Sequence, residues 1–181
     1  MIILLKFIVC AFLTALLFPP FFILPLGFIA FPFLFILLNE RNFLQKSLLF
    51  HFISGIVYGL TLNSIILVWI KDPFFTDDTT KVLVPFSYLL VLYCSIYFGF
   101  IFLFLKFFKN KFSKLILIPT LFVTIEILRE NFIYGFPWVV FSQTYSGNIY
   151  LLNLIYYYGT YGLSFICILF FIFPSFVILL I

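Results

Sequence analysis

The sequence predicts an all-α integral membrane protein, a bundle of about six transmembrane helices. Hydrophobic residues make up 66% of the 181 positions and charged residues only 9%, whereas a soluble domain is about 45–50% apolar and about 25% charged. The mean hydropathy is +1.31. The apolar residues fall into long runs separated by short polar or proline-containing breaks, and a span with its loop needs roughly 25–30 residues. The net charge of +4 is therefore informative about membrane orientation, and we expect no nucleic-acid partner.

Six apolar runs give the predicted helices. We expect them at residues 2–18, 21–38, 48–70, 85–105, 115–134 and 161–181. The first run ends at Pro19 and Pro20, because proline cannot continue a helix. It resembles a signal peptide, but no polar mature region follows it, so the sequence predicts an uncleaved first helix.

The third run carries a stripe of small residues. Gly55, Gly59 and Asn63 are spaced four apart and so lie on one helix face. Small residues let a second helix approach closely, and an asparagine can hydrogen-bond across the contact. We predict a helix-packing role for this stripe.

Four lysines after the fourth run give the orientation. They are Lys106, Lys109, Lys111 and Lys114, and positively charged loops lie on the cytoplasmic side. Alternation then places the N-terminus in the cytoplasm and the segment from Gly135 to Gly159 in the periplasm. That segment is rich in tyrosine and is predicted to lie in the membrane interface. The adjacent carboxylates of Asp77 and Asp78 fall in an outer loop, where we expect them to be solvated and not to bind metal.

The stretch from Glu126 to Gln143 concentrates charge inside an otherwise apolar sequence. Glu126, Arg129 and Glu130 share one helix face, and a charge at membrane depth costs about 3 kcal/mol or more. One interpretation is an internal ion pair between Glu126 and Arg129 that fixes the helix register. Another is the polar lining of a lipid-headgroup site, and a third is ion passage. The candidate site residues are Glu126, Arg129, Glu130, Phe136, Pro137, Trp138 and Gln143.

The residues alone give no complete catalytic constellation. Cys10, Cys94 and Cys167 lie within apolar runs and form no CxxC, so we expect small buried hydrophobic side chains. His51, the single histidine, lies near a helix end and is predicted to be interfacial. No Gly-rich phosphate loop and no cluster of metal ligands occurs in the sequence, so no cofactor is predicted.

Several motifs in order resemble the membrane half of apolipoprotein N-acyltransferase. They are the E-x-L-R of 126–129, the Gly-Phe-Pro-Trp of 135–138, the Ser-Gln of 142–143, the Gly-x-Tyr-Gly-Leu-Ser of 159–164, the Pro-Pro of 19–20 and Trp69. The resemblance implies an enzyme of the bacterial inner membrane. It moves an acyl chain from a phospholipid to the amino group of the lipid-modified N-terminal cysteine of an apolipoprotein. A thioester forms on the cysteine of a Glu-Lys-Cys triad in a nitrilase-like domain.

The resemblance also shows a departure. It implies a seventh helix, the catalytic domain and an eighth helix, whereas this sequence ends at Ile181. We therefore expect a fragment, a truncated frame or half of a split gene that is inactive alone. The expected partners are a membrane phospholipid and, with a catalytic domain supplied, an apolipoprotein. The alternative is a non-enzymatic lipid-binding scaffold or a small transporter, although we find no internal repeat of the kind typical of transporters.

Overall fold

The computed structural model describes residues 2–132, 135 and 138–180. These residues form helices and no strand, in agreement with the predicted all-α class. The α-helices are α1 (Ile2–Ala15), α2 (Gly27–Asn39), α3 (Arg41–Leu44), α4 (Leu48–Ile66), α5 (Val84–Leu105), α6 (Lys111–Asn131), α7 (Ile149–Leu152), α8 (Ile155–Ile172) and α9 (Pro174–Leu180). The 3-10 helices are η1 (Leu24–Leu26), η2 (Val68–Phe75), η3 (Lys81–Leu83) and η4 (Phe141–Gly147).

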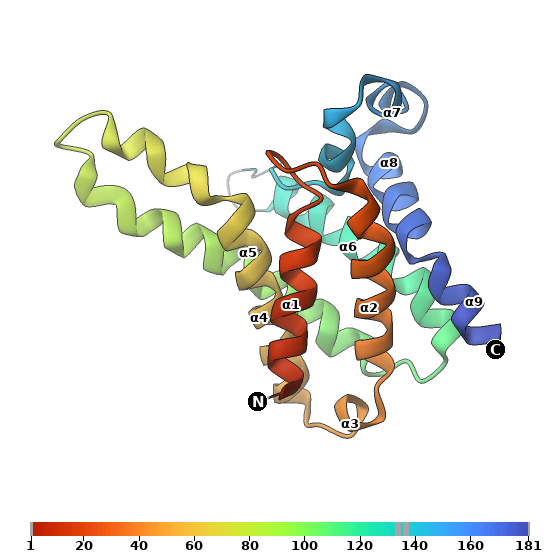
Figure 1. Ribbon diagram of the computed structural model, residues 1–181. Helices are drawn as coiled ribbons and strands as arrows, with labels where there is room; N and C mark the ends of the chain where they lie inside the picture. The colour runs from red at the N-terminus through yellow and green to blue at the C-terminus, as the bar shows by residue number, and fades with distance from the viewer. Residues whose placement is uncertain (1, 133–134, 136–137, 181) are drawn as a thin grey trace.

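Six helices pack side by side in a ring. Going round it, α1 contacts α2, α2 contacts α8, α8 contacts α6, α6 contacts α5, α5 contacts α4, and α4 returns to α1. Figure 1 shows α1 and α2 as a hairpin, with α3 at the lower end of the bundle and α7 at its upper end. The end of α4, η2, η3 and the start of α5 form an arm that projects sideways from the bundle (Figure 1).

The helices suit a membrane protein. Among the described residues, three segments are long and apolar enough to cross a membrane by length and composition, namely Leu48–Ile66, Lys81–Leu105 and Ile155–Ile172. The 19 residues of α4 extend about 28 Å at about 1.5 Å per residue. Two apolar helices, Ile2–Ala15 and Leu24–Asn39, are shorter. The structure thus supports three spans by this measure, and the count of six stays a prediction.

Helix ends in the first half differ from the predicted ranges. The helix of the first run stops at Ala15 and that of the second begins only at Gly27. Between them Phe22 has a φ of 52°, a left-handed conformation that interrupts a helix. Pro25 sits in the first turn of η1, where its missing N–H costs nothing. The third run leaves the α-helix after Ile66 and continues as a 3-10 helix.

Helix ends in the second half differ for similar local reasons. Helix α6 begins at Lys111, earlier than predicted, because the Asn110 side chain accepts a hydrogen bond from the Phe112 N–H at 2.8 Å and caps the helix. Helix α8 begins at Ile155 but is kinked at Gly159, which has a φ of 66°, so the part after the kink begins close to the predicted start at residue 161. A new helix starts at Pro174. The predicted ends at Tyr134 and Ile181 lie outside the described residues.

Helices α4 and α5 meet along the small-residue stripe. A Cβ atom added at Gly55 would lie 2.2 Å from the backbone oxygen of Phe98, and one at Gly59 would lie 2.9 Å from the Ser95 Cα. The Asn63 Nδ2 donates a hydrogen bond to the Ser95 Oγ at 3.1 Å. The two backbones therefore approach as closely as glycine permits.

Phenylalanine rings that contact one another form much of the core of the bundle. Phe141 of η4 lies 5.1 Å from Phe18, 5.6 Å from Phe31 and 5.5 Å from Phe122, measured between ring centroids. Edge-on contacts of this kind are favourable beyond the area they bury. The segment after residue 138 is therefore anchored in the core through Phe141, which is 2% exposed.

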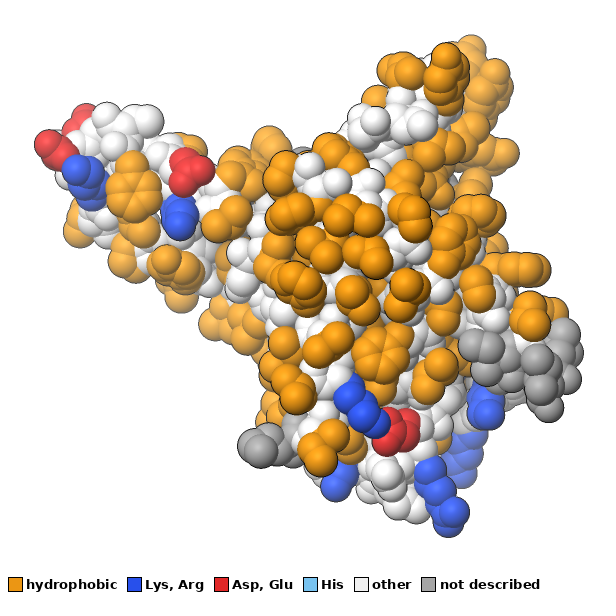
Figure 2. Space-filling model, in the orientation of Figure 1, with side chains coloured by type: hydrophobic (Ala, Val, Ile, Leu, Met, Phe, Trp, Pro, Cys, Tyr) orange, Lys and Arg blue, Asp and Glu red, His pale blue; other side chains and the backbone are white. Residues whose placement is uncertain are grey.

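The lower end of the bundle carries most of the basic side chains (Figure 2). Lys6 and Glu40 form an ion pair at 2.9 Å. One residue there differs from expectation, because Lys114 is not a loop charge but is buried. His51 is also buried within the protein, in the first turn of α4. The His51 Nδ1 lies 2.9 Å from the Ser47 carbonyl, and its ring packs on Phe43.

Lys114 is expected to stabilise the fold through the end of α2. Its Nζ donates a hydrogen bond to the Leu38 carbonyl at 2.9 Å, one of the carbonyls that a helix leaves unpaired at its C-terminus. Lys114→Met should lower the free energy of unfolding by about 1–3 kcal/mol, because a buried acceptor is left unsatisfied. Thermal unfolding in detergent measures this. Lys109→Met, at an exposed position, is the control, and equal melting temperatures of the two variants would contradict the assignment.

Candidate functional site

Glu126 and Arg129 lie in the interior of the bundle but do not form an ion pair. Both are 2% exposed, and the ion pairs among the described residues are Lys6–Glu40 and Lys81–Asp78. The prediction of a direct pair is therefore wrong. Instead, the Glu126 Oε1 accepts a hydrogen bond from the Phe141 N–H at 2.7 Å. The Arg129 Nη2 donates one to the Val139 carbonyl at 2.7 Å.

These two hydrogen bonds, from Glu126 and Arg129, hold the backbone of residues 139–141 against α6, and we call them the clamp. Val139 has a φ of 66°, which is a genuine outlier for a β-branched residue and costs of order 1–3 kcal/mol. The surrounding structure holds it there by three contacts to the segment, since the Ser142 N–H also donates to the Ser164 Oγ of α8 at 2.9 Å. The sequence motif therefore acts through main-chain groups, a role that residue identities do not show.

The clamp leaves polar atoms without hydrogen-bond partners. The Glu126 Oε2 and the Arg129 Nε and Nη1 are buried and unpartnered among the described residues. Buried charged groups are normally satisfied, and an exception marks a functional site or an ordered water. The interior next to the 139–141 segment thus retains capacity for a further polar group.

A cavity of about 360 Å³, here called the polar cavity for the six polar side chains in its otherwise apolar lining, lies beside the clamp at the upper end of the bundle. Its polar lining residues are Glu130, Ser142, Gln143, Ser146, Thr160 and Tyr161. Glu130 is exposed and is the single charge in this lining. The rest of the lining consists of the apolar side chains of Val140, Leu152 and Ile155.

An apolar cavity of about 660 Å³ lies on the other side of the same segment. Its walls are the Pro19-Pro20 turn, residues 65–69 at the junction of α4 and η2, and Trp138 and Val139. The rings of Trp69 and Trp138 lie 5.0 Å apart between centroids. A mostly apolar lining with few polar groups and a volume of 300–1,000 Å³ is typical of small-molecule sites.

Gln143 and Ser146 line both cavities. A polar and an apolar compartment therefore adjoin at one end of the bundle, an arrangement that fits an amphipathic molecule. Of the predicted site residues, the structure brings Glu130, Trp138 and Gln143 to this pair of cavities and places Glu126 and Arg129 behind it. Phe136 and Pro137 lie outside the described residues.

The sequence reasoning missed several of the lining residues. Ser146, Thr160 and Tyr161 come from η4 and α8, and nothing in their spacing links them to Glu130. Pro19 and Pro20 were expected to break the helix and to match a family motif, but not to line a cavity. A signal was available in Trp69 and Trp138, the two tryptophans of the chain, which mark the same interface depth.

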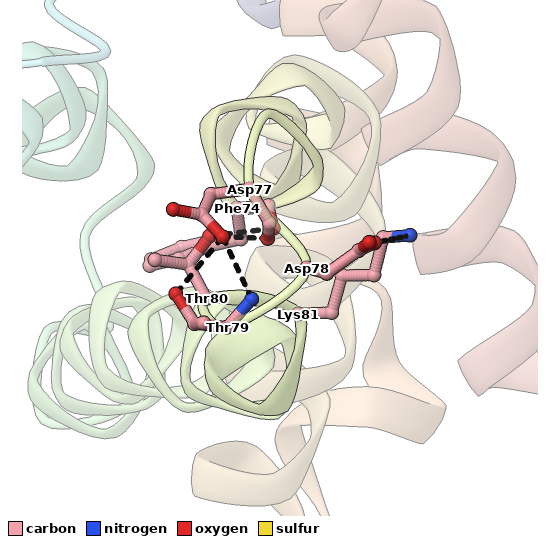
Figure 3. Close-up of polar contacts among 6 residues, drawn as sticks. All are labelled: Phe74, Asp77, Asp78, Thr79, Thr80 and Lys81. Atoms are coloured by element: carbon pink, nitrogen blue, oxygen red, sulfur yellow. Dashed lines mark hydrogen bonds and ion pairs between the residues drawn. The ribbon is translucent and has the colours of Figure 1, made fainter.

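Asp77 and Asp78 lie at the tip of the arm and stabilise its turn. Asp77 accepts hydrogen bonds from the Thr79 N–H at 2.9 Å and the Thr79 hydroxyl at 3.0 Å, and Asp78 pairs with Lys81 at 2.5 Å (Figure 3). The Thr79 hydrogen bonds lower the pKa of Asp77 below its usual value. Among the described residues, no group of three His, Cys, Asp or Glu side chains is placed to hold a metal ion.

The three cysteines are all 0% exposed, each packed within a helix. A nucleophilic cysteine needs an accessible, electropositive setting. None of the three lines the cavities just described.

Comparison with curated proteins found no match. Comparison with protein families matched residues 10–173 to the apolipoprotein N-acyltransferase N-terminal domain. The match covers nearly the whole chain, including the clamp and both cavities. The chain therefore belongs to the family of the apolipoprotein N-acyltransferase N-terminal domain.

Proposed function

We propose that this chain forms the membrane half of a phospholipid:apolipoprotein N-acyltransferase of lipoprotein biosynthesis. In this proposal it spans the bacterial inner membrane six times, with the N-terminus in the cytoplasm and the end that bears the cavities facing the periplasm. The family match supports the reaction class. The clustering of lysines at the opposite, lower end of the bundle (Figure 2) supports the orientation, because positive loops stay in the cytoplasm.

The observation that carries the proposal is the pair of adjoining cavities at the upper end. A phospholipid joins a charged headgroup to apolar chains, and the two compartments meet at Gln143 and Ser146. The apolar cavity beside Trp69 and Trp138 receives an acyl chain. The polar cavity receives the headgroup, whose amine lies near the Glu130 carboxylate.

The residues of the clamp position the wall between these compartments. Glu126 and Arg129 hold residues 139–141 from behind, and Gln143 follows directly in η4. A site of this kind depends on supporting hydrogen bonds that keep its wall in place. Acyl transfer through a thioester needs an accessible thiol, which the family's nitrilase-like domain supplies in this proposal.

Phospholipid binding in the cavities is tested by photocrosslinking. A phosphatidylethanolamine with a diazirine in its acyl chain should label residues 65–69 and 138–146 in the reconstituted chain. Ser146→Phe places a large ring in the wall that the two cavities share. It should reduce this labelling roughly tenfold, equivalent to about 1.4 kcal/mol. Thr120→Phe, at an exposed position of α6, is the control. Labelling that is uniform along the chain, or unchanged in the Ser146 variant, would overturn the site.

The chain alone is expected not to transfer acyl groups. Its cysteines are buried, and a covalent acyl intermediate needs an activated nucleophile. The assay follows a diacylated lipopeptide with the purified chain in phospholipid vesicles, and no triacylated product should form above background. Turnover by the chain alone would show that the chemistry resides in this domain.

A further inference from the structure

We propose that a second lipid site lies between α5 and α6, with one end at Phe107 in the lysine-bearing loop, and that it binds an anionic phospholipid. This site shares no lining residue with the two cavities at the upper end. It therefore does not depend on the proposed acyltransferase role.

The site is an apolar groove of about 390 Å³. It extends from Phe107, in the loop that joins the two helices, to Tyr97 on α5 and Leu128 on α6. Phe100, Phe104 and Phe107 line it and remain 57%, 46% and 66% exposed. Large aromatic side chains thus border a hollow that faces outward from the bundle.

The polar groups of the groove are already satisfied within the protein. The Tyr97 hydroxyl lies 2.6 Å from the Tyr93 hydroxyl, and the Thr124 hydroxyl donates to the Thr120 carbonyl at 2.8 Å. The other lining residues are apolar. The lining of the groove therefore offers a ligand no unpaired hydrogen-bonding group, and an alkyl chain is the ligand that matches this apolar surface.

The loop at the groove's lower end supplies positive charge. Lys106 lies in the 106–110 loop and donates to the Lys46 carbonyl, while Lys109 and Lys111 are exposed and form no ion pair among the described residues. The sequence from 101 to 125 contains no Asp or Glu, and the nearby Glu40 is already paired with Lys6. The positive charge is thus uncompensated by the protein.

A phospholipid with a net negative headgroup complements both features at once. One acyl chain fills the groove while the phosphodiester lies among Lys109 and Lys111. Each basic residue near an anionic lipid surface strengthens binding roughly fivefold. A zwitterionic lipid could place the same chain in the groove, but its ammonium group would offset the gain at the lysines. We therefore assign a preference for anionic over zwitterionic lipid.

The test places a fluorescent reporter in the groove. Phe104→Trp is made in a chain carrying Trp69→Phe and Trp138→Phe, and the protein is reconstituted in phosphatidylcholine vesicles. Brominated-chain phosphatidylglycerol should quench the reporter at a mole fraction roughly 25-fold lower than brominated phosphatidylcholine, since two lysines contribute about fivefold each. Adding Lys109→Gln and Lys111→Gln should abolish this preference. The control is Lys71→Gln with Lys81→Gln on the arm, which should leave it intact.

Equal quenching by the two lipids would overturn the proposal, as would a preference that survives the Lys109 and Lys111 substitutions. Circular dichroism checks that each variant remains helical. Thr124→Trp fills the groove without changing the lysines and should remove the site. Because the added tryptophan would itself fluoresce, this variant is tested by competition between a brominated lipid and a photocrosslinking lipid. Photolabelling at residues 138–146 should be unchanged when Lys109→Gln and Lys111→Gln are made in the chain that keeps Trp69 and Trp138, which separates this site from the cavities at the upper end.

Discussion

Replacing Gly55 with leucine is expected to separate α4 from α5 and to lower the free energy of unfolding by about 3 kcal/mol or more. A Cβ atom at this position would lie 2.2 Å from the Phe98 oxygen and 2.7 Å from the Gly99 Cα. Both obstacles are backbone, so no side-chain rotation relieves the clash. The helices would have to move apart, which would also break the Asn63–Ser95 hydrogen bond. Thermal unfolding in detergent, followed by circular dichroism, measures the loss.

Gly162→Ala is the matched control for this prediction. Gly162 also lies in a helix, but an added Cβ would lie 3.4 Å from the Tyr158 Cβ, an ordinary contact. This variant should unfold within about 1 kcal/mol of the parent, because alanine has the higher helix propensity. If Gly55→Leu were as stable as Gly162→Ala, the close approach of α4 and α5 would be refuted.

Replacing Arg129 with methionine is expected to release the wall between the two upper cavities. Methionine keeps much of the side-chain length but cannot donate to the Val139 carbonyl. Hydrogen bonds to charged groups contribute about 1.5–3 kcal/mol, and Val139 would then be free to leave its left-handed conformation. The expected result is a loss of about 2–3 kcal/mol in stability, by the same reasoning. Labelling of residues 138–146 by the photoactivatable phosphatidylethanolamine should fall as well.

Arg41→Met is the control, since Arg41 is the other arginine of the chain and is exposed on α3. Its stability and labelling should match those of the parent. Glu126→Gln tests the second half of the clamp, because the amide oxygen still accepts from the Phe141 N–H. This variant should therefore retain the labelling that Arg129→Met loses. Intact labelling in Arg129→Met would mean that the guanidinium plays no part in positioning the wall.

Helix ends were predicted correctly where the local sequence marks them strongly. Helix α5 lies within one residue of its predicted start and ends at its predicted end, because a long apolar run is bounded by Pro85 and by Lys106. The ends of α1, α2 and α4 departed from prediction, since positive φ at Phe22 and a change to 3-10 geometry after Ile66 leave no mark in hydropathy. The burial of Lys114 was equally hidden. Its partner is a carbonyl 76 positions away.

The candidate site was predicted by location and misread in its interactions. The unusual density of charged and aromatic residues from Glu126 to Gln143 pointed to the right segment. Helical spacing then suggested that Glu126 and Arg129 would satisfy one another. The fold gave each of them a backbone partner instead, because the chain returns past α6 at residues 139–141 and presents a free N–H and a free carbonyl there.

By itself, the sequence determined the all-helical class, the membrane setting, the close-packing stripe and the family, since composition, periodicity and ordered motifs are properties of the chain. The tertiary structure alone decided that the polar and the apolar cavity meet at Gln143 and Ser146, and that an apolar groove lies between α5 and α6. The physical reason is the same in each case. A cavity is made by surfaces from distant parts of the chain, and its shape depends on how the helices pack rather than on any one of them.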